Sequence, residues 1–524
     1  MTAKSLMIQG TASSVGKSLL VTALCRIFKR RGLRVAPFKS QNMSLNSFIT
    51  EEGLEMGRAQ VAQAEAAGLR PVAAMNPVLL KPSADHMSQI IVMGKVLTTL
   101  DARQYYAFRH ELKAAVQGAY DSLAGEYDLV ILEGAGSPAE INLRKDDIAN
   151  MGMAEMADAP VLLVGDIDRG GVFASLYGTV ALLSASEQER IKAYIINKFR
   201  GDVSLLEPGL RELEKLLSRP VLGVLPYWDV RIDEEDSLTE RLNSRSAAAS
   251  TTREDCLDIL VIRLPRMSNF TDFAVFDALP GCSLRYAAME SPIGQPDLII
   301  IPGSKNTLED MRFLHDSGLA RQILELHRQG VPIIGICGGF QMLGKVIRDP
   351  QQVESGLGEV AGLALLDMES VLLPEKRTVQ NRLSIAAQDV TPMRQGSPNS
   401  GERRSGLLRG MEGLRLNGYE IHMGKTHGPA LERPLGFLDD ARPEGAVSAD
   451  GTVIGSYLHG MFDTIPFTER LMGNLAQACG LPPLSSGSLS YADFREREYD
   501  RLADTVEEHI DMEFLENIIY RRYI

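Results

Sequence analysis

One of the five cysteines stands where a catalytic nucleophile would stand. Cys337 follows the apolar run 331–336, which reads as a buried strand, and precedes Gly338 and Gly339, which open an expected helix. A sharp turn from strand to helix holds a side chain above the sheet, and the helix N-terminus lowers the pKa of a thiol placed there. We therefore predict that Cys337 is a nucleophile, whereas the other four cysteines, which lack such framing, are expected to be structural.

A thiol nucleophile needs an acid–base partner and hydrogen-bond donors for the oxyanion that forms after attack. His459 follows the apolar run 453–458 and should lie at the carboxyl edge of the same sheet. His422 is the alternative, and we favour His459 because it follows a cleaner strand. The backbone amide of Gly338 and the loop amide at Gly303, after another expected strand, are predicted to form the oxyanion hole.

A second group of residues has the composition of a phosphate-binding loop. Residues 10–18, GTASSVGKS, join an expected strand to an expected helix. Glycines let the backbone approach a phosphate, helix N-terminal amides bind its oxygens, Lys17 adds a cation and the Ser18 hydroxyl can bind Mg²⁺. Five residues separate Gly10 from Gly16, one more than in the usual P-loop pattern. The expected ATP-binding residues of this loop are Gly10, Thr11, Gly16, Lys17 and Ser18.

Polar side chains follow other expected strands at the same sheet edge. Glu133 comes directly after the run 128–132, at the edge where ligands of such sheets bind, and can hold Mg²⁺ together with Ser18. Asn197 follows a further run and is expected to hydrogen-bond an adenine edge of ATP. We therefore predict ATP and Mg²⁺ as cofactors. Further candidates for contacts with phosphate or substrate oxygens are Lys39, Gln41 and Asn42.

These side chains can meet only if parallel sheets bring the strand ends together. Short apolar runs alternate with helical patterns, the arrangement of a parallel sheet covered by helices on both faces. We predict an α/β fold with two parallel-sheet domains and a first helix over residues 17–31. The expected strands are residues 5–9, a short one around Val35, 128–132, 160–164, 193–196 and 221–225, then 257–262, 298–301, 331–336 and 453–458.

The composition changes between the two series of strands. Residues 231–236 are mostly charged and residues 244–252 are small and polar, which is typical of an exposed linker. A polar, turn-rich insertion is expected at 391–406. The predicted domains are an ATP-binding domain at 1–230, a linker at 231–255, a domain carrying Cys337 at 256–465 and a helical C-terminal extension at 466–524.

Composition excludes several classes of function. The chain has 524 residues, 44% hydrophobic and 23% charged, which is typical of a multidomain globular protein. The net charge of −13 argues against nucleic-acid binding, and no apolar stretch is long enough to cross a membrane. Scattered cysteines and the absence of an export signal at the N-terminus lead us to expect a cytoplasmic protein. An oligomer is compatible with the sequence but does not follow from it.

Two known families share these motifs. The first half resembles the dethiobiotin synthetase-like ATP-dependent ligases, whose phosphate loop also has the extra residue. The motifs around Gly303, Cys337 and His459 resemble the class I glutamine amidotransferases. That resemblance implies that Cys337 attacks the glutamine side-chain amide and that His459 transfers the proton. Many members carry a glutamate two positions after the histidine, but Met461 stands there, so the third member of the triad is missing from its usual place.

The two halves in this order resemble the cobyric acid synthase family over nearly the whole chain. Residues 41–46, 133–143 and 165–171 carry the more specific likeness, and through it Asp166 and Arg169 become candidate substrate or phosphate contacts. The resemblance implies amidation of the b, d, e and g carboxylates of (adenosyl)cobyrinic acid a,c-diamide, with glutamine and a corrin polycarboxylate as partners.

Other functions compete with this interpretation. A cobyrinic acid a,c-diamide synthase would perform the same chemistry at different carboxylates. A P-loop regulatory ATPase with an inert amidotransferase-like domain belongs to another class, and a peptidase using Cys337 would leave the phosphate loop unexplained. Because both the corrin substrate and the chain are anionic, we expect a local basic surface near the phosphate loop, including Lys39, Arg144, Lys145 and Arg169.

Overall fold

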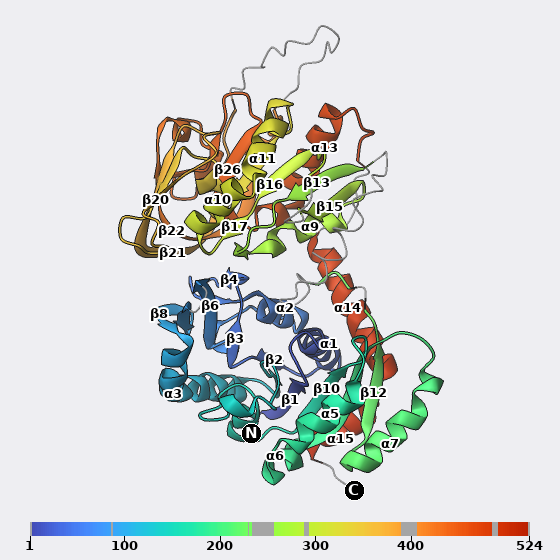
Figure 1. Ribbon diagram of the computed structural model, residues 1–524. Coiled ribbons are helices and arrows are strands. Elements are labelled where there is room, and N and C mark those ends of the chain that lie inside the picture. Colours follow the sequence, from blue (N-terminus) through green and yellow to red (C-terminus); the bar gives the residue numbers. More distant parts are fainter. Residues whose placement is uncertain are drawn as a thin grey trace.

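The chain folds into two lobes, one above the other in Figure 1. The computed structural model describes residues 3–84, 87–228, 230–232, 256–287, 293–388, 406–484 and 491–521. The predicted linker at 231–255 and insertion at 391–406 therefore lie outside the described residues, apart from positions 231, 232 and 406.

The lower lobe is built on a parallel sheet of six described strands in the order β12-β11-β10-β1-β9-β2. Its strands are β1 (Lys4–Gly10), β2 (Val35–Phe38), β9 (Leu129–Glu133), β10 (Val161–Asp166), β11 (Ile191–Phe199) and β12 (Val221–Pro226). Each covers an apolar run predicted from the sequence. The predicted first helix is α1 (Lys17–Arg30).

Both faces of this sheet are covered, as the nearly continuous apolar strands require. In β1, Leu6 and Ile8 pack with α1 on one face, whereas Met7 packs into the core on the other. The first 230 residues also contribute helices α2 (Arg58–Ala66), α3 (Ala102–Glu126), α4 (Met151–Met156), α5 (Val172–Ala181), α6 (Ala185–Arg190) and α7 (Glu207–Leu217), with short 3-10 turns η1 (Ala73–Met75), η2 (Ile141–Leu143) and η3 (Val203–Leu205).

Small strands, which the sequence did not predict, cap this lobe where it faces the upper one (Figure 1). They form a four-stranded sheet, β3-β6-β7-β8, and a hairpin, β4-β5. Their bounds are β3 (Gln41–Met43), β4 (Ser47–Ile49), β5 (Glu55–Gly57), β6 (Val78–Ala84), β7 (Met87–Val92) and β8 (Lys95–Asp101).

The upper lobe contains a second sheet, in the order β15-β13-β16-β18-β26-β25, parallel except at β25. Its strands are β13 (Leu257–Val261), β15 (Cys282–Tyr286), β16 (Leu298–Ile301), β18 (Ile333–Ile336), β25 (Ala446–Val447) and β26 (Val453–Ser456). Its helices are α9 (Ala274–Ala278), α10 (Thr307–Asp316), α11 (Leu319–Arg328), α12 (Gly338–Met342) and α13 (Ile465–Ala478), with η4 (Phe270–Phe273), η5 (Pro429–Glu432) and η6 (Met461–Asp463).

A mostly antiparallel sheet in the upper lobe was not predicted. A long hairpin of β21 (Glu369–Ile385) and β22 (Arg415–His427) forms its centre. The single strand predicted at 453–458 is also wrong in part, because it breaks at Tyr457 and β27 (Leu458–His459) pairs with β22 instead. The remaining short strands are β14 (Met267–Ser268), β17 (Gly303–Ser304), β19 (Val346–Arg348), β20 (Glu359–Ala361), β23 (Gly436–Leu438) and β24 (Pro443–Glu444).

The predicted C-terminal extension is helical but is divided between the lobes. Helix α13 packs into the core of the upper lobe, whereas α14 (Tyr491–His509) and α15 (Met512–Tyr520) pack into the lower one against α1 and β1. In Figure 1, α14 runs down the side of the molecule beside α1.

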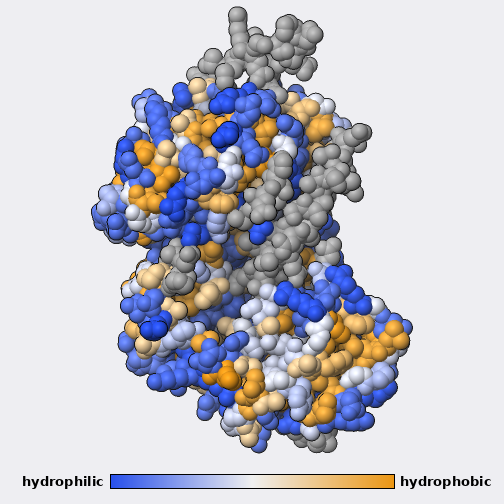
Figure 2. All heavy atoms as spheres, in the orientation of Figure 1, coloured by the Kyte–Doolittle hydropathy of each residue, from blue (hydrophilic) through white to orange (hydrophobic). Residues whose placement is uncertain are grey.

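The surface is mostly polar on the face shown in Figure 2, with apolar side chains gathered over α7. Leu205 and Leu216 are the most exposed large apolar residues there, at 82% and 59%. Among the described helices, none is both long and apolar enough to cross a bilayer.

Candidate functional site

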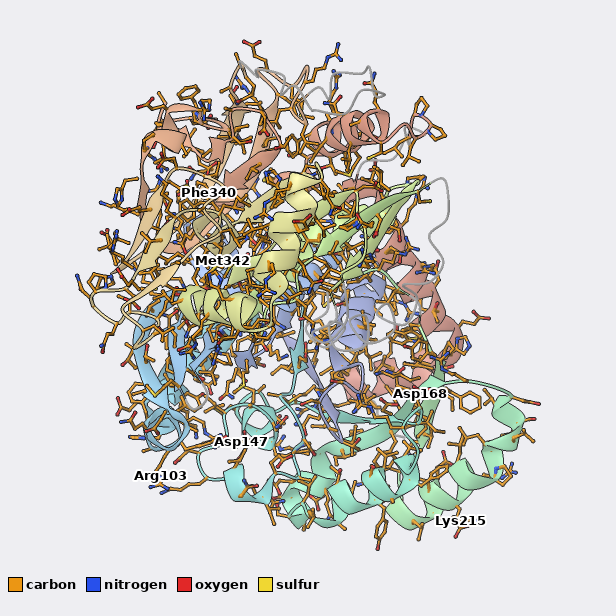
Figure 3. The ribbon with its side chains drawn as sticks, turned by 45° about the horizontal axis from the view of Figure 1, so that its top comes forward. Arg103, Asp147, Asp168, Lys215, Phe340 and Met342 are labelled. Carbon is orange, nitrogen blue, oxygen red and sulfur yellow. The ribbon has the colours of Figure 1, made fainter. Side chains whose placement is uncertain are left out.

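Cys337 lies at a tight turn between β18 and α12, as the sequence predicted for a nucleophile. Its φ of 53° is positive, a conformation that side chains other than glycine rarely adopt, and its backbone N–H donates to the Ser456 carbonyl at 2.8 Å. The following turn needs glycine, because a Cβ on Gly339 would lie 2.0 Å from the Ile301 carbonyl oxygen. Phe340 and Met342, labelled in Figure 3, mark α12 within the upper lobe. The thiol is therefore held by strain and close packing.

His459 is the histidine that contacts this cysteine. Its Nδ1 lies 2.7 Å from Oδ2 of Asp272, and its ring lines the same small cavity as the Cys337 thiol, which itself donates to the Ile421 carbonyl at 3.4 Å. Burial alone would lower the pKa of His459, but the negative charges and hydrogen bonds of Asp272 and Cys337 raise it to about 10. The arrangement therefore favours a protonated imidazole beside the Cys337 side chain. A cysteine nucleophile needs an acid–base partner of this kind.

Asp272, the acid bonded to His459, is a candidate site residue that the sequence analysis did not identify. It lies in η4, its second oxygen accepts from the Gly460 amide at 3.2 Å, and it is 5% exposed. The usual position for the third residue is occupied by Met461, which is buried. No sequence signal distinguishes Asp272 from other acids, because it lies 187 residues before His459 and follows no long apolar strand.

The alternative histidine lies nearby without that contact. His422 stacks on Tyr457 with ring centroids 3.8 Å apart, and its Nε2 lies 3.4 Å from a Glu420 oxygen. Arg377 and Arg442 also bind Glu420 and, with His422, hold its pKa at about 2 although burial would raise it. His422 therefore belongs to the wall of the site.

The two predicted oxyanion donors lie close together. A Cβ on Gly338 would lie 2.9 Å from the Ser304 backbone nitrogen, so the turn after Cys337 abuts the strand containing Gly303. The amide of Gly338 is in the first turn of α12, where a helix provides no acceptor for it. Gly303 is paired in register with Ser268 across β14-β17. The oxyanion hole remains a prediction, with Gly338 the better-placed donor.

A small cavity of about 40 Å³ lies over Cys337 and His459, and both lobes line it. Lys305, Glu354 and Lys376 come from the upper lobe, and Lys81 comes from β6 of the lower one. The site around Cys337 is therefore completed by a residue of the other lobe.

The predicted phosphate loop wraps around the Lys17 side chain. The Lys17 ammonium donates to the carbonyls of Ala12 at 2.8 Å and Gly136 at 3.2 Å. A Cβ on Gly10 would lie 2.5 Å from a methyl group of Val15, so the loop requires glycine at its start. Gly16 has a φ of 92° and caps α1. The loop thus has the lysine and the helix N-terminus that bind phosphate.

Glu133 lies beside this loop. One of its oxygens accepts from the Ser18 hydroxyl at 2.7 Å and from the Lys39 ammonium at 2.8 Å, and the other accepts from Gln63 at 2.6 Å. Burial would raise the pKa of Glu133, but the Lys39 charge and these hydrogen bonds hold it below its usual value. The carboxylate is therefore ionised and adjacent to the Ser18 hydroxyl, as two ligands of one magnesium ion would be.

The remaining candidates lie near this edge with contacts of their own. Asn197 donates to the Val15 carbonyl at 2.8 Å and so braces the loop, while its predicted adenine contact remains a prediction. Gln41 accepts from the Tyr105 hydroxyl at 2.5 Å, and Asn42 donates to Gln60 at 2.9 Å. Thr11 continues from β1, its amide bonded to the Val164 carbonyl. Asp166 pairs with Lys198 at 3.4 Å, and Arg169 is exposed.

The basic surface expected near the phosphate loop is wrong for two of its four residues, Lys39 and Arg144. Lys39 is buried against Glu133, and Arg144 lines a separate hollow of about 940 Å³. That hollow, at the starts of β10 and β11, lies on the opposite edge of the sheet from the phosphate loop, and its lining mixes acids such as Asp147 (Figure 3) with bases. Lys145 and Arg169 remain exposed cations.

Comparisons with known proteins agree with this two-part architecture. Residues 6–238 match the family model described as CobQ/CobB/MinD/ParA nucleotide binding domain, and residues 258–467 match CobB/CobQ-like glutamine amidotransferase domain. A protein of Alkaliphilus metalliredigens named cobyric acid synthase is 50% identical over 98% of this chain and 99% of its own. One of the same name from Yersinia enterocolitica is 52% identical over 97% and 96%.

Proposed function

The chain belongs to the cobyric acid synthase family, and on that premise we propose how its two lobes divide the reaction. It is a glutamine-hydrolysing, ATP-dependent amide ligase of cobalamin biosynthesis. The upper lobe releases ammonia from glutamine, and the lower lobe activates a carboxylate with ATP. The observation that carries this division is the contact of Cys337 with the His459–Asp272 pair, in a cavity to which the lower lobe contributes Lys81.

In the upper lobe, the Cys337 thiolate attacks the carbonyl carbon of the glutamine side-chain amide. The developing oxyanion accepts hydrogen bonds from the backbone around Gly338. His459 donates its proton to the departing nitrogen, the C–N bond breaks, and ammonia leaves a glutamyl thioester. His459 then takes a proton from water, which attacks the thioester and releases glutamate. Asp272 holds the imidazole in orientation throughout.

In the lower lobe, a substrate carboxylate oxygen attacks the γ-phosphorus of ATP, and ADP leaves with the electrons of the broken P–O bond. Lys17 and the loop amides offset the charge that develops on the phosphoryl oxygens. Ammonia then attacks the carbonyl carbon of the acyl phosphate, loses a proton and displaces phosphate, which leaves the amide.

The Ser18 hydroxyl and the Glu133 carboxylate suit Mg²⁺, which prefers oxygen ligands and needs few from the protein when it also binds phosphates. Among the described residues, no group of three or more His, Cys, Asp or Glu side chains forms a metal-binding cluster. A magnesium ion held here supplies positive charge to the phosphates of ATP.

The substrate follows from the family. The reaction is the amidation of the b, d, e and g carboxylates of (adenosyl)cobyrinic acid a,c-diamide to cobyric acid, with one glutamine and one ATP for each amide. The matched relatives carry the name cobyric acid synthase, which disfavours the a,c-diamide synthase alternative. Incubation with the unamidated acid and with the a,c-diamide distinguishes the two by which corrinoid is consumed.

We place the reaction in the cytoplasm, because all five cysteines are free thiols, as in a reducing compartment. Glutamine and the corrin polycarboxylate are small-molecule partners, and the negative net charge disfavours nucleic acid.

The experiment that tests the division uses two variants of the full chain. Cys337→Ser is expected to abolish glutamine-dependent synthesis and to retain synthesis from added ammonia, because only glutamine hydrolysis needs the thiol. Lys17→Ala is expected to lower synthesis from either nitrogen source by roughly 10²-fold or more while retaining glutaminase. Loss of both activities in Cys337→Ser, or undiminished synthesis in Lys17→Ala, would contradict the proposal.

A further inference from the structure

The cavity over Cys337 contains more charged groups than thioester chemistry uses. Lys81, Lys305, Glu354 and Lys376 all line it, in addition to the catalytic histidine. Taking charged groups out of water costs free energy unless they are paired. Lys81 and Lys376 share the single carboxylate of Glu55, and within the described part of the chain neither Lys305 nor Glu354 forms an ion pair, so this concentration of charge calls for a reason.

Two of the lysines converge on one neutral acceptor. The ammonium groups of Lys305 and Lys376 both donate to the side-chain oxygen of Gln89, each at 3.3 Å. These are long hydrogen bonds, and the two positive charges repel each other. Burial lowers the pKa of Lys305 and brings that of Lys376 to about 7, although Glu55 pulls the latter upward. A carboxylate between the two lysines would be a better acceptor than the amide that they now share.

Glu354 is the acid that lines the cavity, and a cation would stabilise it where an anion would stabilise the lysines. A carboxylate oxygen of Glu354 accepts from the Thr307 backbone amide at 2.7 Å. Burial raises the pKa of Glu354 to about 7, which the charge of Lys305 and this hydrogen bond only partly oppose. A cation bound beside Glu354 would stabilise its ionised form.

Glutamine supplies both charges on one carbon, joined by two methylene groups to the amide that Cys337 attacks. We propose that Lys305 and Lys376 bind the α-carboxylate of glutamine and that Glu354 binds its α-ammonium group. This assignment rests on the proposed glutaminase function of Cys337. Since the cavity is only about 40 Å³, the long lysine side chains swing to accept the substrate.

The lower lobe takes part in this recognition through Glu55. This buried carboxylate binds Lys81 at 2.8 Å within its own lobe and Lys376 at 2.5 Å across the interface. Glu55 is thus a positioning residue for Lys376, and glutamine binds fully only when the two lobes are docked.

The test compares three amides in the full-length protein: L-glutamine, glutaramate, which lacks the amino group, and 4-aminobutanamide, which lacks the carboxylate. Lys305→Gln is expected to lower kcat/KM roughly 10- to 100-fold for the two compounds that carry a carboxylate and to have little effect on 4-aminobutanamide. Glu354→Gln is expected to lower kcat/KM by a similar factor for L-glutamine and 4-aminobutanamide, which carry an ammonium group. It should have little effect on glutaramate, which carries none. Where an analogue is hydrolysed too slowly to give kcat/KM, its inhibition constant as a competitive inhibitor of glutamine hydrolysis is compared between the variants instead.

Lys345→Gln and Glu359→Gln serve as matched controls, because their side chains are 52% and 67% exposed and form surface ion pairs. Equal losses on all three amides would overturn the proposal, because Lys305 or Glu354 would then act through Cys337 rather than on the substrate. Unchanged values would overturn it as well. If the unmodified protein hydrolyses no glutamine, the proposed function itself fails.

A separate measurement tests the role of Glu55 at the interface between the lobes. Glu55→Gln is expected to raise the KM for glutamine several-fold with kcat nearly unchanged, and synthesis from ammonia shows that the variant is folded. A fall in kcat at constant KM would mean that Glu55 supports catalysis and not glutamine recognition.

Discussion

At the scale of single residues, the triad depends on one carboxylate that stands outside both catalytic turns. Asp272 binds Nδ1 of His459, which leaves Nε2 of the ring for the thiol. The same carboxylate contributes to the raised pKa of His459, so it also favours the protonated imidazole beside the Cys337 side chain.

Asp272→Asn tests that role. The amide can occupy the same space but carries no charge, so the pKa of His459 falls and the thiolate loses stabilisation. Glutaminase kcat/KM is expected to fall on the order of 10²-fold or more, with the alkaline limb of its pH profile moved to lower pH. Synthesis from ammonia should be unaffected. An unshifted pH profile with full glutaminase activity would show that Asp272 does not act on His459.

A second buried carboxylate affects stability. Burial and the nearby charge of Glu420 raise the pKa of Glu444 to about 7, while hydrogen bonds from the Tyr457 amide and the Ser456 hydroxyl oppose the shift. The folded pKa therefore lies above the ordinary value of 4.5, and folding favours the protonated acid. Stability is greatest below about pH 4.5 on this account and decreases as the pH rises to about 7.

Glu444→Gln should remove this dependence, because glutamine resembles the protonated acid. At pH 8 we expect the variant to be more stable than the unmodified protein by roughly 2–3 kcal/mol, and at pH 4.5 nearly equal to it. Thermal denaturation at both pH values measures the difference, with the exposed Glu359→Gln as control. The same pH dependence in both proteins would rule out Glu444 as its source.

At the scale of elements, the turn before β4 links the lower lobe to the triad. Asn46 accepts from the Phe270 amide at 3.1 Å, and the Ser47 carbonyl accepts from Asn269 and from the Tyr419 hydroxyl, each at 3.1 Å. Phe270 begins the short helix that contains the triad aspartate, and Tyr419 stacks on the catalytic histidine with centroids 5.4 Å apart. Figure 1 shows β4 facing β21 and β22 at this junction.

Asn46→Ala should therefore weaken glutaminase although the residue belongs to the lower lobe. The Phe270 amide loses its buried acceptor, at a cost of about 1–3 kcal/mol, and we expect glutaminase to fall several-fold while synthesis from ammonia continues. Gln380→Ala is the matched control, because it removes another interlobe hydrogen bond, to the Ile49 carbonyl, away from the loop of the triad. Equal effects of the two variants would show a general loosening of the interface.

At the scale of the whole molecule, described residues from several parts of the chain hold the lobes together, and two of these parts are prominent in the fold. The hairpin β4-β5 docks on β21 and β22, and the C-terminal segment passes from α13 in the upper lobe to α14 on the lower one. On that lower lobe, Arg26 of α1 donates to the Asp500 carboxylate at 2.8 and 3.0 Å. Because Lys81 of the lower lobe lines the cavity together with residues of the upper lobe, we expect ammonia to be released at the interface and not on the outer surface of the upper lobe.

We therefore expect ammonia to pass between the lobes without mixing with solvent, where most of it would be protonated and lose its lone pair. During turnover with unlabelled glutamine, ¹⁵N-ammonium added to the buffer should not enter the amide product. Mass spectrometry of the product measures this, and Cys337→Ser supplied with the same ammonium is the positive control. Free incorporation of label during glutamine turnover would contradict the prediction.

Local patterns were enough to identify both reactive turns. A strand, a glycine-rich turn and a helix are contiguous in the chain, so residues 331–339 and 10–18 specify the surroundings of Cys337 and Lys17 by themselves. Most strands of the two mainly parallel sheets were predicted for the same reason, because strands buried on both faces are continuous apolar runs. β15 and β25, at the two edges of the upper sheet, were not predicted. The long hairpin β21-β22 has mixed burial without such a run, and it was missed.

Only the tertiary structure decided which distant residues complete these turns. Asp272, Glu55 and Lys81 are acids and lysines of the kinds that usually lie on surfaces, and no local pattern distinguishes them. Asp272 reaches the site because the fold of the upper lobe places η4 beside β27. Glu55 and Lys81 reach it because the lower lobe docks on the upper one along β4 and β5. The sequence by itself predicted the turn at Cys337 and the loop of residues 10–18 as the reactive sites, whereas the folded molecule decided which residues charge, orient and enclose them.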